Sequence, residues 1–259
     1  MKQLLWALPL ALLGATGCSS QANDTTATTE PVAIETPAAN ATDANATDAN
    51  VTDAKAADAN AADANAPDDA YRVTPAMPGL PAPAATALAK VKVPPPPKGM
   101  KVPDTARVRL ETSKGPIVVE LNGKAAPLHV KSFLYLSQRG FYDGTQFHRY
   151  EPDFVIQGGD PLSKSEETRE FAGIGGPGYE IPREKNALAH EAMVIAAARS
   201  QDPDSAGSQF YFTLKPAPFL DEGDGYTVFG KVVEGEANVF QLRKGDTLKK
   251  VTVISESAK

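Results

Sequence analysis

The sequence predicts a mainly β domain at residues 103–259, preceded by a segment that does not fold on its own. Toward the C-terminus, short apolar runs alternate with Gly, Pro, Asp and Ser, as they do in proteins built from many short antiparallel strands. Residues 18–102 are mostly Ala, Asn, Thr, Asp and Pro, with too few large apolar side chains to offset the entropy of ordering the chain. Many antiparallel strands with one or two helices favour a closed barrel or a sandwich.

The elements of this domain can be placed in order along the chain. Residues 107–121 alternate apolar and polar side chains around a turn at 113–115, which predicts a hairpin. Pro127 stands where a helix can begin, and apolar residues follow it at helical spacing as far as Gly140. Further apolar runs predict strands at 194–198, 210–214, 226–233 and 251–254.

The first residues have the layout of a secretory signal. Lys2 precedes an apolar run at 4–13, which is too short for a membrane span because a span needs about 20 apolar residues. The segment LLGATGC, which ends at Cys18, resembles the lipobox of bacterial lipoproteins. We therefore expect residues 1–17 to be a signal peptide and Cys18 to carry a lipid anchor. An ordinary signal peptide cleaved nearby is the alternative, since Ala15 stands where the lipobox usually has leucine.

Ser19 does not resemble an inner-membrane retention signal, so the expected location is the outer membrane, facing the periplasm. Cys18 is the only cysteine, which excludes an intramolecular disulfide.

The segment after this signal is expected to be a disordered tether. From Asp43 to Asp63 an Asp recurs every five residues, a period that builds no buried face and lacks the glycines and final glutamate of a calcium loop. Prolines accumulate at 74–98, which predicts an extended polyproline II spacer.

Composition and motifs exclude several classes of function. The chain carries 26 Lys and Arg against 32 Asp and Glu, for a formal net charge of −6, so no basic excess is available to neutralise nucleic-acid phosphates. A covalent hydrolase needs a nucleophile beside a base, but Cys18 lies outside the domain and no GxSxG motif occurs. His129, His148 and His190 are too far apart in sequence for a zinc motif, and GIGGPG at 173–178 lacks the Lys-Ser/Thr of a phosphate loop. These exclusions leave a site that binds and polarises its substrate without covalent chemistry, a metal or a cofactor.

Three segments, in the same order, resemble the cyclophilin-type peptidyl-prolyl isomerases. They are FHRYEPDFVIQGGDP at 147–161, AGSQFYF at 206–212 and FLDEGDGYTVFGKV at 219–232. The similarity covers residues 105–256 and implies a closed eight-stranded antiparallel barrel capped by two helices. It implies nothing about the tether.

The resemblance also implies which residues act on the substrate. Arg149 matches the catalytic arginine, and Gln157 matches the glutamine that contacts the substrate and steadies the arginine. Rotation of an X-Pro bond breaks amide resonance against a barrier of about 18–20 kcal/mol. An arginine that donates toward the prolyl nitrogen or its neighbouring carbonyl favours the twisted state over the planar one. Apolar walls strengthen this donation because they exclude water.

The remaining substrate contacts are implied to surround this arginine. The residues implied to bind substrate are Phe154, Val155, Gln209, Tyr211, Phe219, Leu220, Tyr226 and His148. For His148 a packed and hydrogen-bonded imidazole is the alternative, whereas Arg199 is expected to offer its backbone and not its side chain. Phe219 stands where eukaryotic members have the tryptophan that contacts cyclosporin, which puts strong binding of that drug in doubt. Tyr211 and Tyr226 replace a phenylalanine and a histidine and keep an aromatic surface.

The implied partners are proline-containing unfolded or extended polypeptides, and the implied role is X-Pro isomerisation by a monomer during the folding of exported proteins. Two other classes of function stay open. One is a binding module that holds exported chains without turnover, and the other is a structural envelope lipoprotein whose domain is a spacer. Met193 and Ala197 differ from the glycine and methionine usual in their strand, a change expected to alter core packing more than catalysis.

Overall fold

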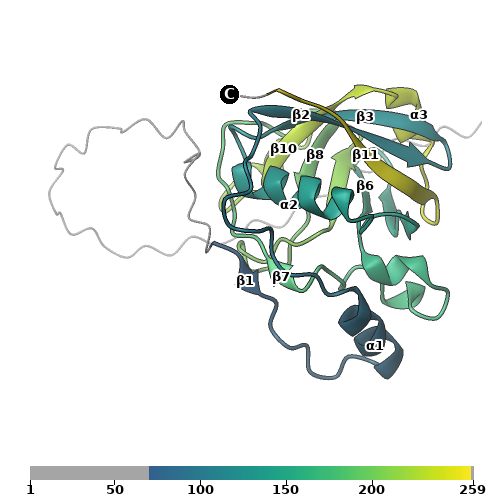
Figure 1. The fold of residues 1–259 in the computed structure, drawn as a ribbon. Coiled ribbons are helices and arrows are strands. Elements are labelled where there is room, and N and C mark those ends of the chain that lie inside the picture. Colours follow the sequence, from purple (N-terminus) through teal and green to yellow (C-terminus); the bar gives the residue numbers. More distant parts are fainter. Residues whose placement is uncertain (1–69, 258–259) are drawn as a thin grey trace, which may run out of the picture. The chain divides into compact units, whose positions relative to one another are not determined.

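The computed structural model describes residues 70–257, which form a curled antiparallel sheet of nine strands with few helices (Figure 1). The order across the sheet is β4-β11-β2-β3-β10-β8-β9-β6-β5. The bounds of these strands are β2 (Thr105–Thr112), β3 (Gly115–Asn122), β4 (Thr145–Gln146), β5 (Arg149–Glu151), β6 (Val155–Gly158), β8 (Val194–Ala197), β9 (Phe210–Thr213), β10 (Val228–Glu234) and β11 (Thr247–Ser257). Two short strands pair with each other separately and are β1 (Arg72–Val73) and β7 (Tyr179–Glu180). The helices are α1 (Ala82–Val91), α2 (Pro127–Gln138) and α3 (Glu236–Gln241), with short 3₁₀ helices η1 (Pro161–Lys164), η2 (Arg169–Phe171) and η3 (Pro218–Leu220).

The mainly β class and the predicted elements are confirmed. The predicted hairpin is formed by β2 and β3, which pair along their whole length. Alternate side chains of a strand point to the same face of its sheet, and in β2 the buried ones are Ala106, Val108, Leu110 and Thr112. The helix predicted to begin at Pro127 is α2, and the four later apolar runs fall in β8, β9, β10 and β11.

The sheet has nine strands, not the eight that the resemblance implies, because the segment from β4 to β5 is interrupted. β4 and β5 stand at opposite ends of the strand order, yet only Phe147 and His148 separate them in sequence. The Phe147 N–H donates to the Asp246 carbonyl at 2.9 Å, and the His148 N–H donates to the Gln157 carbonyl at 3.0 Å. The two ends of the curled sheet are therefore joined by one bent segment and not by a ladder between β4 and β5. The expected closed barrel of eight strands is therefore replaced by a curled sheet of nine strands, whose end strands β4 and β5 do not pair with each other.

The main core lies between the sheet and α2. Every residue of α2 except the last is buried, and the Phe133 and Tyr142 rings stack with centroids 4.9 Å apart. The N-terminus of α2 lacks a side-chain cap from its own preceding residue. The Glu184 carboxylate takes this role, accepting hydrogen bonds from the backbone N–H groups of Leu128 at 2.8 Å and His129 at 2.9 Å. These bonds satisfy donors that a helix N-terminus leaves free.

Residues 70–102 are folded against the rest of the domain and do not form a separate tether. β1 pairs with β7, the Tyr71 hydroxyl donates to the Leu128 carbonyl at 2.9 Å, and Ala84 in α1 is fully buried. The extended spacer expected over 74–98 is therefore wrong where α1 is helical, and the folded region begins before residue 103. Alanine, which dominates α1, has the highest intrinsic preference for helix, and this preference outweighs the proline content of the segment.

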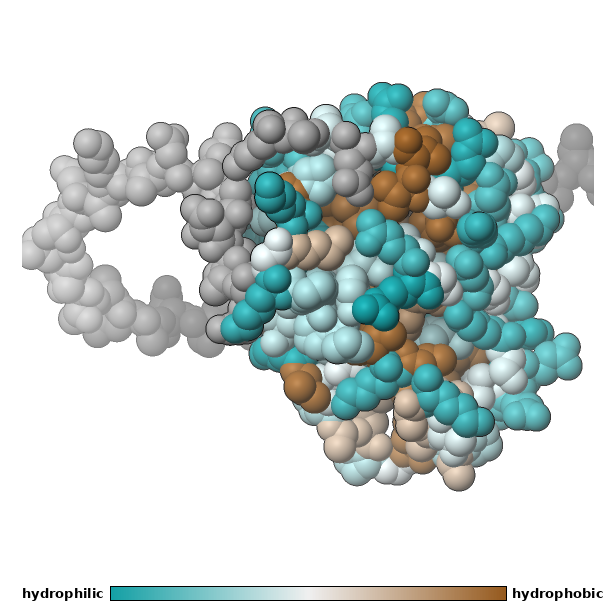
Figure 2. Space-filling view, in the orientation of Figure 1, coloured by the Kyte–Doolittle hydropathy of each residue, from teal (hydrophilic) through white to brown (hydrophobic). Residues whose placement is uncertain are grey.

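The predicted signal at 1–17, the anchor at Cys18 and the Asp repeat lie outside the described residues. Within residues 70–257, no helix combines the length and the apolar character needed to cross a membrane. Figure 2 shows hydrophilic side chains spread over one face of the molecule, with smaller apolar areas between them.

Candidate active site

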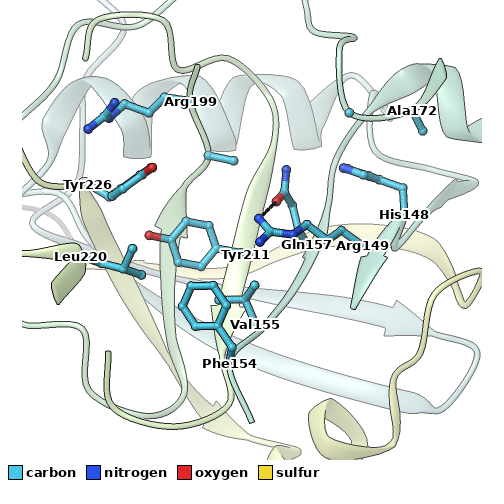
Figure 3. Close-up of a pocket in the computed structure, with 12 residues that line it drawn as sticks. His148, Arg149, Phe154, Val155, Gln157, Ala172, Arg199, Tyr211, Leu220 and Tyr226 are labelled. Carbon is cyan, nitrogen blue, oxygen red and sulfur yellow. Dashed lines mark hydrogen bonds between the residues drawn. The ribbon is translucent and has the colours of Figure 1, made fainter. Parts of the chain in front are cut away.

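A pocket of about 500 Å³ opens beside β5, β6 and β9. The residues that line it are His148, Arg149, Phe154, Val155, Gln157, Ala172, Gly173, Ala198, Arg199, Tyr211, Leu220 and Tyr226 (Figure 3). Of the residues predicted to act on or bind substrate, only Gln209 and Phe219 are not among them. Within residues 70–257, no three His, Cys, Asp or Glu side chains are grouped as metal ligands would be.

Arg149 and Gln157 face each other across the hairpin of β5 and β6, where they are partners in the strand register. Arg149 Nη1 donates to Gln157 Oε1 at 3.4 Å, the contact dashed in Figure 3. The arginine side chain is 48% exposed, with Glu151 Oε1 3.7 Å from its Nε, and its Cζ lies 5.9 Å from the centre of the Phe154 ring. Arg149 is thus steadied at the pocket and keeps N–H donors for a substrate.

A chain of amide hydrogen bonds connects Gln157 to a loop that borders the pocket. Gln157 Nε2 donates to Gln209 Oε1 at 2.9 Å. Gln209 Nε2 donates to the carbonyls of Gly173 and Gly175 at 3.0 and 2.8 Å and lies 3.2 Å from Asp160 Oδ2. The Gln209 side chain therefore binds this loop, and its expected contact with a substrate backbone stays a prediction.

Asp160 is the buried carboxylate of the first motif, and it shapes the same loop. Asp160 is 0% exposed; its Oδ1 accepts from the Leu162 N–H at 2.7 Å, and its Oδ2 accepts from the N–H groups of Gly173 and Gly175 at 2.6 and 2.8 Å. A Cβ at Gly175 would meet Asp160 Oδ1, so only glycine allows this close approach. Asp160 thus forms the turn after β6 and does not line the pocket.

The floor of the pocket is apolar and aromatic. Val155 and Tyr211 are buried in a cluster against which Phe154, Leu220 and Tyr226 pack. Figure 3 shows the Tyr211 ring between Arg149 on one side and Leu220 and Tyr226 on the other. An apolar floor of this kind suits the ring of a proline and lowers the local dielectric around a neighbouring charge.

Phe219 lies at the outer rim of the pocket. Its side chain is 58% exposed, and its ring centroid is 5.5 Å from that of Phe154. Phe219 thus extends the aromatic surface outward, where it can contact a polypeptide that continues beyond the pocket.

Beneath the floor, Tyr211, His190 and Asp221 form a hydrogen-bonded set of side chains, and the sequence motifs do not predict that these three residues meet. His190 Nε2 is 2.8 Å from the Tyr211 hydroxyl, and His190 Nδ1 is 2.5 Å from Asp221 Oδ1. Burial is the main cause that raises the pKa of Tyr211, so its hydroxyl stays protonated near neutral pH. His190 and Asp221 are 31 residues apart in sequence, and no local spacing indicates that they meet.

His148 and Arg199 lie on opposite sides of the pocket (Figure 3). Neither ring nitrogen of His148 makes a hydrogen bond of normal geometry among the described residues, although the Gln146 backbone and the Gln209 side chain lie close enough to raise its pKa. The alternative of a packed and hydrogen-bonded imidazole stays a prediction. Burial lowers the pKa of His148, against the opposite effect of the Asp160 carboxylate. Arg199 donates to the Gly225 carbonyl from Nε at 3.2 Å and from Nη2 at 2.9 Å, and its Cζ is 4.3 Å from the centre of the Tyr226 ring. The side chain of Arg199 therefore builds one wall of the pocket, although only its backbone was expected to contribute.

The comparisons with known proteins agree with this fold. The family model described as "Cyclophilin type peptidyl-prolyl cis-trans isomerase/CLD" matches residues 107–257, and the chain belongs to this family. It is 39% identical over 151 residues to a peptidyl-prolyl cis-trans isomerase of Synechococcus elongatus, covering 58% of this chain and 97% of the relative. It is 37% identical over 139 residues to a "Peptidyl-prolyl cis-trans isomerase-like 2" of Cryptococcus neoformans, covering 54% of this chain and 24% of the length of that relative.

A solved structure shows the same similarity. The crystal structure of a cyclophilin-type peptidyl-prolyl cis-trans isomerase from Cryptosporidium parvum, in the presence of the dipeptide Ala-Pro, matches with a TM-score of 0.51 and 29% identity. The match covers 58% of this chain and 99% of that chain.

Proposed function

We propose that this protein is a peptidyl-prolyl cis/trans isomerase that accelerates the rotation of X-Pro bonds in unfolded or extended polypeptides. The observation that carries the proposal is the position of Arg149, which is steadied by Gln157 and keeps N–H donors beside an apolar floor. Membership of the family supports the activity. The Ala-Pro dipeptide named with the Cryptosporidium structure supports a proline-containing substrate.

In the proposed mechanism the proline ring rests on Val155 and Tyr211, between Phe154 and Leu220. The planar amide must twist against a barrier of about 18–20 kcal/mol. As resonance is lost the prolyl nitrogen gains electron density, so an Arg149 N–H donates to the twisted state more strongly than to the planar one. This difference lowers the barrier, because only interactions that are stronger in the transition state accelerate a reaction.

The residue types of the site suit this mechanism. An arginine keeps its charge at every physiological pH and offers several donors in a rigid plane. The apolar floor increases the value of each donated hydrogen bond because it excludes water. Gln157 reduces the positions that the arginine samples, which keeps its donors near the substrate nitrogen. The substrate neither gains nor loses a proton, so the site needs no general base.

We also propose that the protein is held by a lipid on Cys18 at the outer membrane, facing the periplasm, and that as a monomer it assists the folding of exported proteins. The support comes from the sequence LLGATGC, the apolar run before it and the residue after it. Incorporation of labelled palmitate into the full chain, but not into Cys18→Ser, is the expected result. A full chain that is exported without label contradicts the anchor.

The activity is tested by exchange NMR on an Ala-Pro peptide with the chain from Ser19 onward, which lacks Cys18 and retains every described residue. The uncatalysed exchange takes about 10–100 s at 25 °C, so catalysis is measured against a slow background. We expect a small molar fraction of the protein to bring the two isomers into fast exchange. A folded protein that binds the peptide without accelerating its exchange contradicts the enzyme and favours the binding module.

A further inference from the structure

The segment of residues 70–102, called the N-terminal strap from here on, precedes the part of the chain that matches the family model. It nevertheless packs on the family domain, with β1 beside β7 (Figure 1). Two loops that border the pocket contact the strap. One is the loop at 172–178, and the other is the turn at 199–205. Neither contains a helix or a strand, so external contacts are needed to fix their positions.

The strap contacts the first loop through its backbone. The Thr74 N–H donates to the Gly178 carbonyl at 3.2 Å, and the Val93 N–H donates to the Pro177 carbonyl at 2.9 Å. At Gly178 a Cβ would lie 2.5 Å from Lys92 Cγ, which shows how closely the two segments approach. The same loop supplies Ala172 and Gly173 to the pocket lining and the carbonyls that bind Gln209.

The strap contacts the second loop through Arg72. Arg72 Nη2 donates to the Asp204 carbonyl at 2.6 Å and to Asp202 Oδ2 at 3.1 Å. The same nitrogen lies 3.4 Å from Glu180 Oε2 on β7. Asp204 in turn accepts from the Arg183 N–H at 2.9 Å. One guanidinium thus connects the strap, the strand β7 that follows the first loop, and the turn that begins at the pocket residue Arg199.

We propose that the N-terminal strap fixes these two walls of the pocket and that Arg72 is a positioning residue for substrate binding. Ordering a loop at the moment of binding costs affinity, and a loop that is already ordered avoids that cost. Arg72 does not line the pocket, so its loss weakens peptide binding and leaves the arginine-assisted step unchanged. The proposal rests on the proposed isomerase activity for its kinetic readout.

The test compares Arg72→Gln, Arg72→Lys and the parent protein in the full chain, with Lys90→Gln as a control that removes an exposed cation from α1. We expect Arg72→Gln to raise KM for an Ala-Pro peptide roughly 1.5- to 5-fold, the range for exposed ion pairs, while kcat changes less than about twofold. Arg72→Lys should recover part of the loss because it retains the charge, and Lys90→Gln should leave both constants unchanged. An unchanged KM in Arg72→Gln, or an equal rise in Lys90→Gln, overturns the proposal.

A second readout does not depend on turnover. The Arg183 amide donates to Asp204, which Arg72 holds, so its hydrogen exchange reports the position of the turn. We expect exchange at Arg183 to be faster in Arg72→Gln and unchanged in Lys90→Gln. If the parent protein proves inactive, the proposed function fails, and the Arg183 amide still decides whether Arg72 fixes this wall. Equal exchange in the parent and in Arg72→Gln overturns the proposal.

Discussion

The hydroxyl oxygen of Tyr211 lies 2.8 Å from Nε2 of His190, directly beneath the pocket floor. Because burial raises the pKa of Tyr211, the hydroxyl keeps its proton. The other ring nitrogen, Nδ1, lies 2.5 Å from Asp221 Oδ1. The floor is therefore fixed by two hydrogen bonds in series. One joins the Tyr211 hydroxyl to the buried imidazole of His190, and the other joins this imidazole to the partly exposed carboxylate of Asp221.

Removing the Tyr211 hydroxyl tests this arrangement. Tyr211→Phe leaves Nε2 of a buried histidine without its partner, which should lower the free energy of unfolding by about 1–3 kcal/mol. The aromatic floor remains, so isomerase activity should be largely retained. Urea denaturation measures the loss, with Tyr226→Phe as a matched control at the pocket rim. Equal stability losses in the two variants would show that the bond to His190 contributes nothing specific.

The link between Gln209 and the loop at 172–178 is tested by reversing one hydrogen-bond role. Gln209→Glu keeps the size of the side chain but replaces its N–H donor with an acceptor that faces Asp160 and the carbonyls of Gly173 and Gly175. We expect kcat/KM to fall about tenfold, since an unmatched polar group of this kind costs about 1–3 kcal/mol. Gln209→Met, which loses the bonds without adding charge, should lose less. Full activity in Gln209→Glu would mean that the loop does not depend on this amide.

The lowered pKa of His148 predicts a dependence of stability on pH. Burial and nearby Lys244 lower this pKa, while Asp160 opposes them. The unfolded chain therefore binds a proton at His148 at a higher pH than the folded protein does. The free energy of unfolding increases with pH wherever the unfolded state binds more protons than the folded state. The stabilisation that comes from keeping His148 neutral is therefore fully present above the unfolded pKa of about 6.5. It is lost as the pH falls through the lower pKa of the folded protein.

Urea denaturation at pH 7.5 and at pH 5 measures this effect. The free energy of unfolding should fall less between the two values in His148→Gln than in the parent protein. Identical losses on acidification in both proteins would show that His148 does not carry the effect.

The close contact between the N-terminal strap and Gly178 predicts a specific cost for an added methyl group. Gly178 and Gly79 have φ angles of 97° and 79°, so alanine is strained at both positions by about 1–2 kcal/mol. Only at Gly178 does a Cβ also meet Lys92, whereas nothing lies within 4 Å at Gly79. Gly178→Ala should therefore lower the unfolding free energy by about 1 kcal/mol or more beyond Gly79→Ala. Thermal unfolding of the two variants decides the point, and equal losses would argue against close packing of the strap.

Much of the fold and the pocket could be predicted from local patterns. The alternation in β2 and β3 and the spacing of α2 follow from periodicities that these elements impose. Arg149, Phe154, Val155 and Gln157 fall within one short motif, so a single hairpin carries them to the pocket together.

Other features depend on contacts between distant residues. His190 and Asp221 are 31 residues apart in sequence. Backbone contacts bring them together, since the Ala217 N–H donates to the His190 carbonyl at 2.8 Å and the His190 N–H donates to Asp221 Oδ2 at 3.1 Å. The side chain of Arg199 reaches the pocket because the Gly225 carbonyl holds it, which no motif encodes. The prolines of the strap predict an extended spacer, but the structure packs this segment on the domain. Ala84 is fully buried, and scattered apolar side chains such as Tyr71 and Val93 pack partly buried against the core, without a regular spacing that a sequence pattern would show.

The central claim is that Arg149 accelerates rotation of the X-Pro bond, and exchange NMR on Arg149→Ala tests it most directly, because one titration yields both peptide affinity and exchange rate. Arg149 is about half exposed, so the variant should fold. We predict that affinity changes little while the rate falls about 10²- to 10³-fold, as for the loss of other preorganised donors. A rate within about twofold of the parent protein at equal affinity would contradict the account.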